Sequence, residues 1–175
     1  MLAPELPAAA EKVLVVGQVD DDAAVAAMRA LAPGASGNIN RWLLAEARRR
    51  FPNACIIFKP HPDVERMNRA GAISAREDKR LADFILPSIA IGRLLPVAGR
   101  VVTFGSLAGF EALLRGKPVT VLGMPFYAGW GLTEDSLSNP RRGVRRSIDE
   151  LAAAALLHYP RYWDPESNLA CSPET

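Results

Sequence analysis

The sequence predicts an α/β protein built on a doubly wound, Rossmann-like parallel sheet. Short apolar runs rich in β-branched residues alternate with segments of helical periodicity, as in parallel sheets. Several of these runs end at glycine or proline, which bounds them as strands. Hydrophobic residues make up 49% of the 175 residues and charged residues 23%, a composition typical of one globular domain with a real core.

The amino-terminal third is expected to form two strands and the two helices between them. Residues 12–17, KVLVVG, are an apolar run that ends in glycine, and residues 54–59, ACIIFK, are a second such run. Between them, the alanine-rich residues 22–34 predict a helix that a Pro-Gly pair ends. A second helix is expected over residues 39–51, with Asn38 as its N-cap.

The middle of the chain is less regular. Residues 61–82 are polar and predict no helix or strand. Residues 83–87, DFILP, predict a short strand, and residues 88–99 predict a helix broken near Pro96. Residues 100–104, RVVTF, are again a β-branched apolar run and predict a strand.

The carboxyl-terminal part adds two helices and one strand. A helix is expected over residues 106–116, between a serine N-cap and a glycine after the last turn. Residues 118–123, PVTVLG, predict a strand, and Ser147 and Glu150 form a capping-box pattern that begins a helix over 147–159. Right-handed crossovers place the carboxyl ends of parallel strands at one edge, where ligands of such sheets bind.

The sequence suggests a leader over residues 1–11, a Rossmann-like domain over 12–165 and a flexible tail over 166–175. A net charge of +2 is too small to indicate a nucleic-acid partner. Cys55 and Cys171 are too few for a disulfide framework, so a reducing cytoplasm fits best. No apolar run approaches the roughly 20 residues of a membrane-spanning helix.

The pair Gly105-Ser106 opens a predicted helix directly after a strand. The free N–H groups of a helix start, here at Ser106 and Leu107, bind phosphate together with the helix dipole. Glu111 lies about one turn further along, where its carboxylate could accept hydrogen bonds from ribose hydroxyls. A plain strand–helix unit with a good N-cap and a solvent-facing glutamate explains this segment equally well.

The segment KPHP follows a predicted strand at the same edge. His61 can donate a hydrogen bond to a phosphate oxygen, and Lys59 can neutralise its charge. Pro60 and Pro62 fix their φ angles and stiffen the turn. A lone histidine is more often structural, but these flanking residues favour a phosphate contact.

Three consecutive acids, Asp20 to Asp22, follow the first strand. They suggest a metal ligand, a general base or a nucleophile, while an aspartate-rich turn with a helix N-cap is the alternative. No second carboxylate cluster or histidine pair accompanies them, so no dedicated metal cage is expected.

Two further segments carry candidates for an acceptor site. In residues 123–135, Tyr127 and Trp130 could stack on a sugar or a base, and the glycines suggest a mobile loop. Anchoring of a long loop by aromatic residues is the alternative. Arg141 and Arg142 belong to a cluster of four arginines that could bind an anionic acceptor or a lipid headgroup, or form a solvated patch.

Four stretches resemble the capsule polysaccharide biosynthesis family, whose best-known members are retaining β-Kdo transferases of the KpsC type. They are VLVVGQVDDDA, FKPHPDV, GSLAGFEALLRGKPVTVLGMPFYAGWGLTED and SIDELAAAALLHYPRYWDP, which together run from about Val13 to Pro165. The resemblance implies the carboxyl-terminal, nucleotide-binding half of a GT-B glycosyltransferase module. It also implies a bacterial role in capsule polysaccharide synthesis and transport.

The resemblance further implies roles for particular residues. Gln18 and Asp22 match the family's Gln-Val-x-x-Asp pattern, with Asp22 as the covalent nucleophile. His61 with Pro62 matches its His-Pro pair, and Ser106 its phosphate-binding serine. The donor would be CMP-Kdo and the acceptor a lipid of the phosphatidylglycerol type, with no tightly bound cofactor.

The resemblance places the chain in the cytoplasm, at the inner face of the inner membrane. A partner chain would supply the amino-terminal half. Two alternatives stay open: a non-catalytic or split nucleotide-binding module, and another nucleotide-sugar enzyme of the same architecture, such as a 2-epimerase.

Overall fold

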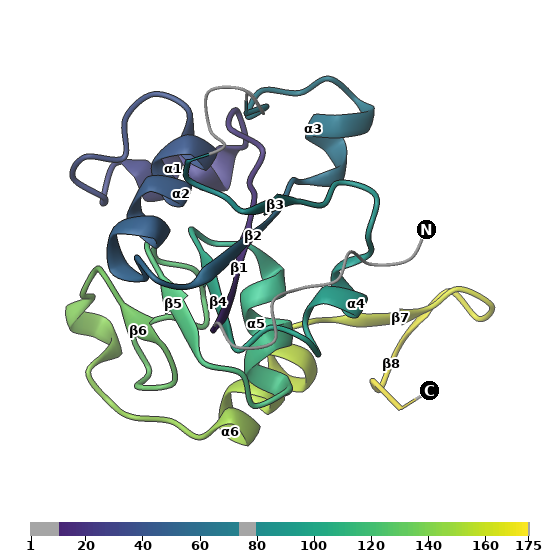
Figure 1. Cartoon of the computed structure of the whole chain (residues 1–175). Coiled ribbons are helices and arrows are strands. Elements are labelled where there is room, and N and C mark those ends of the chain that lie inside the picture. Colours follow the sequence, from purple (N-terminus) through teal and green to yellow (C-terminus); the bar gives the residue numbers. More distant parts are fainter. Residues whose placement is uncertain (1–10, 74–79, 175) are drawn as a thin grey trace.

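A six-stranded parallel sheet forms the centre of the molecule (Figure 1). The computed structural model describes residues 11–73 and 80–174. The strand order is β3-β2-β1-β4-β5-β6, and every neighbouring pair is parallel. The strands are β1 (Lys12–Val16), β2 (Cys55–Lys59), β3 (Phe84–Ile85), β4 (Arg100–Thr103), β5 (Val119–Val121) and β6 (Glu134–Asp135). The predicted Rossmann-like class is therefore confirmed, and the strand order reverses between β1 and β4, where such folds bind ligands.

Helices cover both faces of the sheet. They are α1 (Ala23–Arg29), α2 (Ile39–Arg50), α3 (Pro62–Arg66), α4 (Ile91–Leu94), α5 (Leu107–Leu114), α6 (Ile148–Ala153), the 3₁₀ turn η1 (Pro140–Arg142) and the π-helical turn η2 (Ala154–His158). Val13 and Val15 of β1 pack in a cluster with residues of α1 and α2. Leu14 and Val16 pack in a second cluster with residues of α4, α5 and α6. Successive strand side chains thus enter two cores, as expected of a buried parallel strand.

The helix boundaries follow the predicted caps. The Asn38 side chain accepts from the N–H groups of Asn40 and Arg41 at the start of α2. Ser147 and Glu150 form both hydrogen bonds of the capping box at α6. After α5, Gly116 has a φ of 66°, a left-handed conformation that favours glycine.

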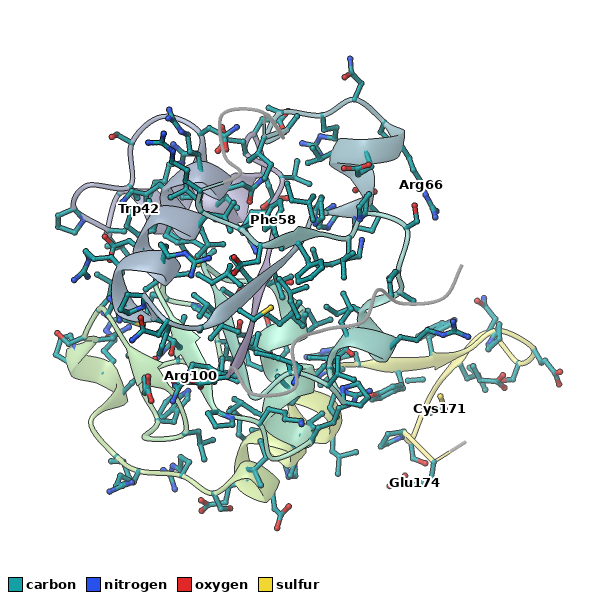
Figure 2. The ribbon with its side chains drawn as sticks, viewed as in Figure 1. Trp42, Phe58, Arg66, Arg100, Cys171 and Glu174 are labelled. Carbon is teal, nitrogen blue, oxygen red and sulfur yellow. The ribbon has the colours of Figure 1, made fainter. Side chains whose placement is uncertain are left out.

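The stretch 61–82, for which no element was predicted, contains the short helix α3. His61 accepts a hydrogen bond from the first turn, and Pro62 occupies the first helical position, where its missing N–H is not needed. Arg66 extends outward from this helix, while Phe58 of β2 lies in the buried core (Figure 2). In residues 88–99 the helix α4 covers one turn only.

The carboxyl-terminal segment forms an antiparallel hairpin of β7 (Tyr162–Asp164) and β8 (Leu169–Cys171). The hairpin projects from the body of the molecule in Figure 1. The boundary expected at residue 165 falls inside this hairpin, and the division into domain and tail stays a prediction. Residues 1–10 of the expected leader lie outside the described residues. Among the described helices, none is long and apolar enough to span a membrane.

Candidate functional site

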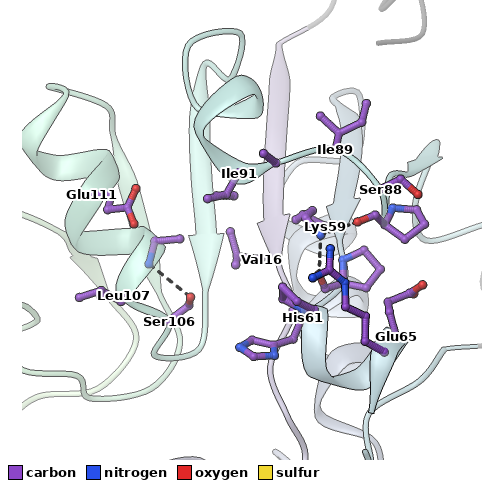
Figure 3. Close-up of a pocket in the computed structure, with 17 residues that line it drawn as sticks. Val16, Lys59, His61, Glu65, Ser88, Ile89, Ile91, Ser106, Leu107 and Glu111 are labelled. Atoms are coloured by element: carbon purple, nitrogen blue, oxygen red, sulfur yellow. Dashed lines mark hydrogen bonds between the residues drawn. The ribbon is translucent and has the colours of Figure 1, made fainter. Parts of the chain in front are cut away.

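A cleft of about 470 Å³ opens at the carboxyl ends of β1, β2 and β4, which we call the carboxyl-edge cleft. Figure 3 shows its two walls, with Ser106, Leu107 and Glu111 of the α5 segment facing Lys59, His61 and Glu65. The lining residues are Val16, Gly17, Lys59, Pro60, His61, Pro62, Glu65, Arg66, Pro87, Ser88, Ile89, Ala90, Ile91, Ser106, Leu107, Ala108 and Glu111. The cleft thus brings together the two predicted phosphate-binding segments, although His61 and Ser106 are 45 residues apart in the sequence.

The turn after β2 holds His61 in a defined orientation. The Nδ1 atom of His61 accepts a hydrogen bond of 3.2 Å from the Asp63 backbone N–H. In the neutral ring the proton must then sit on Nε2, which can donate to a ligand. A Cβ at Gly17 would come within 3.2 Å of the backbone nitrogen of His61. The absence of a side chain at Gly17 therefore lets this turn lie close to the end of β1.

Lys59 is a buried cation in the cleft wall, with 6% of its surface exposed. Its Nζ donates to the backbone oxygens of Pro60 (3.0 Å) and Pro87 (2.7 Å). Burial lowers the pKa of the Lys59 ammonium, and the nearby Arg66 guanidinium lowers it further, while Glu65 opposes the shift. An ammonium has three N–H donors, so one is left for an anionic ligand in the cleft.

The start of α5 forms the opposite wall. Ser106 caps this helix by accepting from the Ala108 N–H (3.3 Å), while its own N–H donates to the Thr103 hydroxyl (3.0 Å). Within the described part of the chain, the Leu107 N–H has no hydrogen-bond acceptor. Leu107, rather than Ser106, therefore offers the free backbone donor at this helix end. Glu111 lies further along the same wall, 3.5 Å from Arg115 in an ion pair.

Gly105, which the sequence also made a candidate for nucleotide binding, does not line the cleft. A Cβ there would overlap the Met28 side chain. Within α5, a Cβ at Gly109 would overlap the Tyr127 hydroxyl and ring. Both glycines are therefore explained by close packing, against Met28 at Gly105 and against Tyr127 at Gly109.

Gln18 points into the protein and does not line the cleft. Its side-chain nitrogen donates to the oxygens of Val16, Gly17 and Thr103, and its backbone N–H donates to Asn40 Oδ1 (2.7 Å). Asn40 is itself buried and donates to the oxygens of Gln18 and Gly71. Sequence reasoning missed Asn40, although a polar residue beside the apolar stripe of a helix is a signal that could have indicated it.

The three acids after β1 are not gathered in one site. Asp20 forms an ion pair with Arg29 and accepts from the Ile39 N–H, and Asp21 forms an ion pair with Arg69. Asp22 caps α1, accepting from the Ala24 N–H at 2.8 Å and the Val25 N–H at 3.4 Å. The cap interpretation of Asp22 is therefore confirmed, and the structure does not bring its carboxylate into the cavity that holds Lys59 and His61.

The expected stacking role of Tyr127 is wrong, because this side chain is completely buried. Its hydroxyl donates to the Ser106 backbone oxygen at 2.5 Å, and burial raises the pKa of this hydroxyl well above its ordinary value. Trp130 lies outside the carboxyl-edge cleft, with the Arg142 guanidinium 5.7 Å from its ring centre. Arg142 also donates to the backbone oxygens of Pro125 and Ala128. Aromatic anchoring of the 123–135 loop, the alternative interpretation, fits these contacts.

Arg141 is exposed and does not line the cleft. The structure adds wall residues that sequence reasoning missed, namely Glu65, Arg66 and the turn 87–91. The position of this turn, directly after a predicted strand at the same sheet edge, was a usable signal. No group of three or more His, Cys, Asp or Glu side chains able to hold a metal ion occurs in residues 11–73 and 80–174.

Solved structures with this fold include two KpsC transferases. The Thermosulfurimonas dismutans KpsC β-Kdo 2,7 transferase is 37% identical, with a TM-score of 0.81, and the match covers 97% of this chain and 52% of that chain. The β-Kdo 2,4 transferase of KpsC from the same organism is 32% identical, with a TM-score of 0.78 and coverages of 98% and 52%. The chain therefore spans about half the length of either solved structure.

Curated relatives give a consistent result. The capsule polysaccharide modification protein LipA of Neisseria meningitidis serogroup B is 48% identical over 163 residues, which are 93% of this chain and 22% of LipA. The lipopolysaccharide-processing protein LpsZ of Rhizobium meliloti is 41% identical over 156 residues, covering 89% of this chain and 34% of LpsZ. Residues 2–162 match the family described as capsule polysaccharide biosynthesis protein. The chain belongs to the capsule polysaccharide biosynthesis family.

Proposed function

We propose that the chain is the nucleotide-sugar-binding half of a retaining glycosyltransferase that acts in capsule polysaccharide synthesis, with CMP-Kdo as its donor. The observation that supports this most directly is the carboxyl-edge cleft, where a histidine donor, a buried lysine and the start of α5 face one another. The two KpsC structures compared above are described as Kdo transferases, and we extend that activity to this chain as a proposal.

The cleft has hydrogen-bond donors of the kind that bind the phosphate of a nucleoside monophosphate. The third N–H of Lys59, the Nε2–H of His61 and the free N–H of Leu107 can each donate to phosphate oxygens. Glu111 lines the same wall further along α5, and we assign it the ribose hydroxyls. As the bond from phosphate to sugar breaks, negative charge grows on the departing phosphate, and these donors stabilise it.

Retention of configuration requires two successive displacements. A carboxylate attacks the anomeric carbon, CMP leaves with the electron pair of the broken bond, and an acceptor hydroxyl then displaces the carboxylate and loses its proton. We assign the carboxylate to Asp22 on the family pattern. Because Asp22 lies outside the carboxyl-edge cleft, the proposal places the sugar between this loop and the half of the module that the chain does not include.

The acceptor and partner follow from the same proposal. The acceptor is a lipid of the phosphatidylglycerol type, and a second Rossmann-like half completes the site, at the cytoplasmic face of the inner membrane. No resident cofactor takes part in the proposed steps. The half-length match to the solved structures supports the need for a second half.

The donor assignment is tested by the nucleotide preference of the isolated chain. Calorimetry with CMP, UMP and AMP should give the tightest binding for CMP, since the cleft is proposed to hold a cytidine nucleotide. Equal affinity for the three nucleotides would favour another nucleotide-sugar enzyme of the same architecture.

A nucleotide-binding module without catalysis of its own is the second candidate, because the chain spans only about half of each solved transferase. Both candidates predict CMP binding. They differ in a transfer assay in which the second half is supplied: restored transfer supports the enzyme, and its absence supports the binding module.

A further inference from the structure

A second hollow, separate from the carboxyl-edge cleft, lies along α6 and η2. Its volume is about 530 Å³, and it is lined by Phe126, Trp130, Leu151, Ala154, Ala155 and Tyr159. We call it the α6 groove. It shares no lining residue with the carboxyl-edge cleft, and the proposed donor chemistry makes no use of it.

The walls of the α6 groove are aromatic and open to solvent. Tyr159 is 88% exposed and Phe126 is 43% exposed, although large aromatic side chains usually bury most of their surface. The same helical segment exposes Leu156 and Leu157 by nearly half. Contiguous apolar surface of this kind marks a contact site for a protein or a membrane.

Arginines border this apolar surface on one side. A neighbouring hollow of about 320 Å³ is lined by Arg146 and Glu150 and shares Trp130, Leu151 and Ala154 with the α6 groove, so the two hollows adjoin. A Cβ at Gly131, next to Trp130 in sequence, would come within 3.0 Å of the Arg145 side chain, which places Arg145 on the same border.

The charge balance of this border is positive. Arg145 and Arg146 are its basic residues, and Glu150 is the acid that lines the same hollow. The Glu150 carboxylate accepts from the Ser147 N–H at 2.8 Å and pairs with Arg146 at 3.5 Å, so one positive charge of the two remains unbalanced. The border therefore presents guanidinium groups next to an apolar groove, a combination that complements a phosphate joined to hydrocarbon.

We propose that the α6 groove and its arginine border dock on the surface of a bilayer that contains anionic phospholipid. Tyrosine and tryptophan side chains are enriched at the level of the lipid headgroups, and arginines bind the phosphates there. The apolar wall residues insert at the boundary between headgroups and acyl chains. This docking needs neither CMP-Kdo nor transfer, so it can stand or fall apart from the proposed function.

The test is sedimentation of the 175-residue chain with vesicles. Wild type should bind vesicles of phosphatidylcholine with phosphatidylglycerol and release from them as salt rises, and it should bind pure phosphatidylcholine much more weakly. The double variant Arg145→Gln/Arg146→Gln should weaken binding about 25-fold, since each basic residue near an anionic surface contributes about five-fold. Tyr159→Ser should weaken the binding that remains at high salt.

Matched variants separate this face from charge in general. Arg49→Gln/Arg93→Gln removes the same charge from exposed positions on α2 and α4 and should bind like wild type. Arg145→Lys/Arg146→Lys keeps the charge and should retain most of the binding, which also controls for folding. Equal losses in the two glutamine pairs, or no binding of wild type to anionic vesicles, would overturn the proposal. Self-association of the chain that Tyr159→Ser abolishes, without vesicle binding, would assign the groove to a protein contact instead.

Discussion

His61 has two functions at once, since one ring nitrogen caps α3 and the other is free to meet a ligand. His61→Ala should weaken CMP binding by about 1.5–3 kcal/mol, the contribution of a hydrogen bond to a charged group. Calorimetry measures this directly. His61→Asn keeps a good N-cap and so controls for damage to α3. Unchanged CMP affinity in both variants would remove His61 from the site.

Lys59 makes the binding of CMP sensitive to alkaline pH. Its pKa is lowered from the ordinary 10.5, chiefly by burial, so it loses its charge at a lower pH than an exposed lysine would. The charged form binds phosphate, and therefore CMP affinity should fall as pH rises, beginning below pH 10.5. Lys59→Met should bind CMP weakly and show no such fall when dissociation constants are measured across the same range. A parallel decline in both proteins would exclude Lys59 as the titrating group.

Asp22 combines a structural role that the structure shows with a catalytic role that is proposed. Asparagine is also a good N-cap, so Asp22→Asn should leave α1 and CMP binding intact while it removes the attacking carboxylate. Transfer by the complete module should then fall by several orders of magnitude, as losses of covalent nucleophiles do.

The neighbouring acids provide the comparison. Asp21→Asn removes a surface ion pair with Arg69, and Asp20→Asn weakens the contact with Arg29, so both should cost some stability but far less activity. If the Asp22→Asn variant retains normal transfer while Asp20→Asn or Asp21→Asn abolishes it, the nucleophile has been assigned to the wrong aspartate. Activity in all three variants would contradict the double displacement.

At the scale of elements, α5 is fixed from behind by the 123–135 loop. Gly109 leaves room for Tyr127, whose hydroxyl holds the Ser106 oxygen. Gly109→Ala should therefore destabilise the protein by about 1–3 kcal/mol through overpacking, as measured by urea unfolding. Gly92→Ala, in α4, meets no atom within 4 Å and should be neutral or slightly stabilising. Similar effects of the two substitutions would show that the Tyr127 contact does not constrain α5.

The elements differ in how well the sequence predicts them. Buried β-branched runs such as that of β2 predict their own conformation, and so do caps such as Ser147, because both depend on nearby residues. The helix α3 was missed because Pro62 was interpreted as part of a stiff turn, although a proline at the first helical position begins helices. The burial of Tyr127 depends on Gly109, which is 18 residues away, and no local pattern reports such a contact.

The candidate site shows the same division. Lys59, His61, Leu107 and Glu111 were placed in one cleft from the rule that parallel strands share a carboxyl edge, and the structure brings them together. Gln18 lies beside the same edge, but its side chain turns inward, because buried backbone oxygens and the Thr103 hydroxyl accept its hydrogen bonds. The topology of the sheet predicts where a loop lies, and only the packing decides which way a side chain points.

At the scale of the whole molecule, the chain spans about half of each of the two KpsC structures compared with it. We expect the isolated chain to bind CMP but to show no transfer, because the acceptor side of the site is proposed to lie in the other half. Addition of that half, in trans or by fusion, should restore transfer, measured as Kdo incorporated into a lipid-linked acceptor. Transfer by the isolated chain would show that this half is sufficient.

The β7–β8 hairpin is expected to have a lower local stability than the central sheet. Its strands have three residues each and pair only with one another in the described structure, and Trp163 on it is 59% exposed. A lone pair of strands is marginally stable in water, so its amide protons should exchange with deuterium through local opening, far faster than those of β1. Such exchange would leave a slow-exchanging sheet and a fast-exchanging arm. A partner that covers the hairpin would slow exchange in that arm alone, and would thereby reveal where it docks.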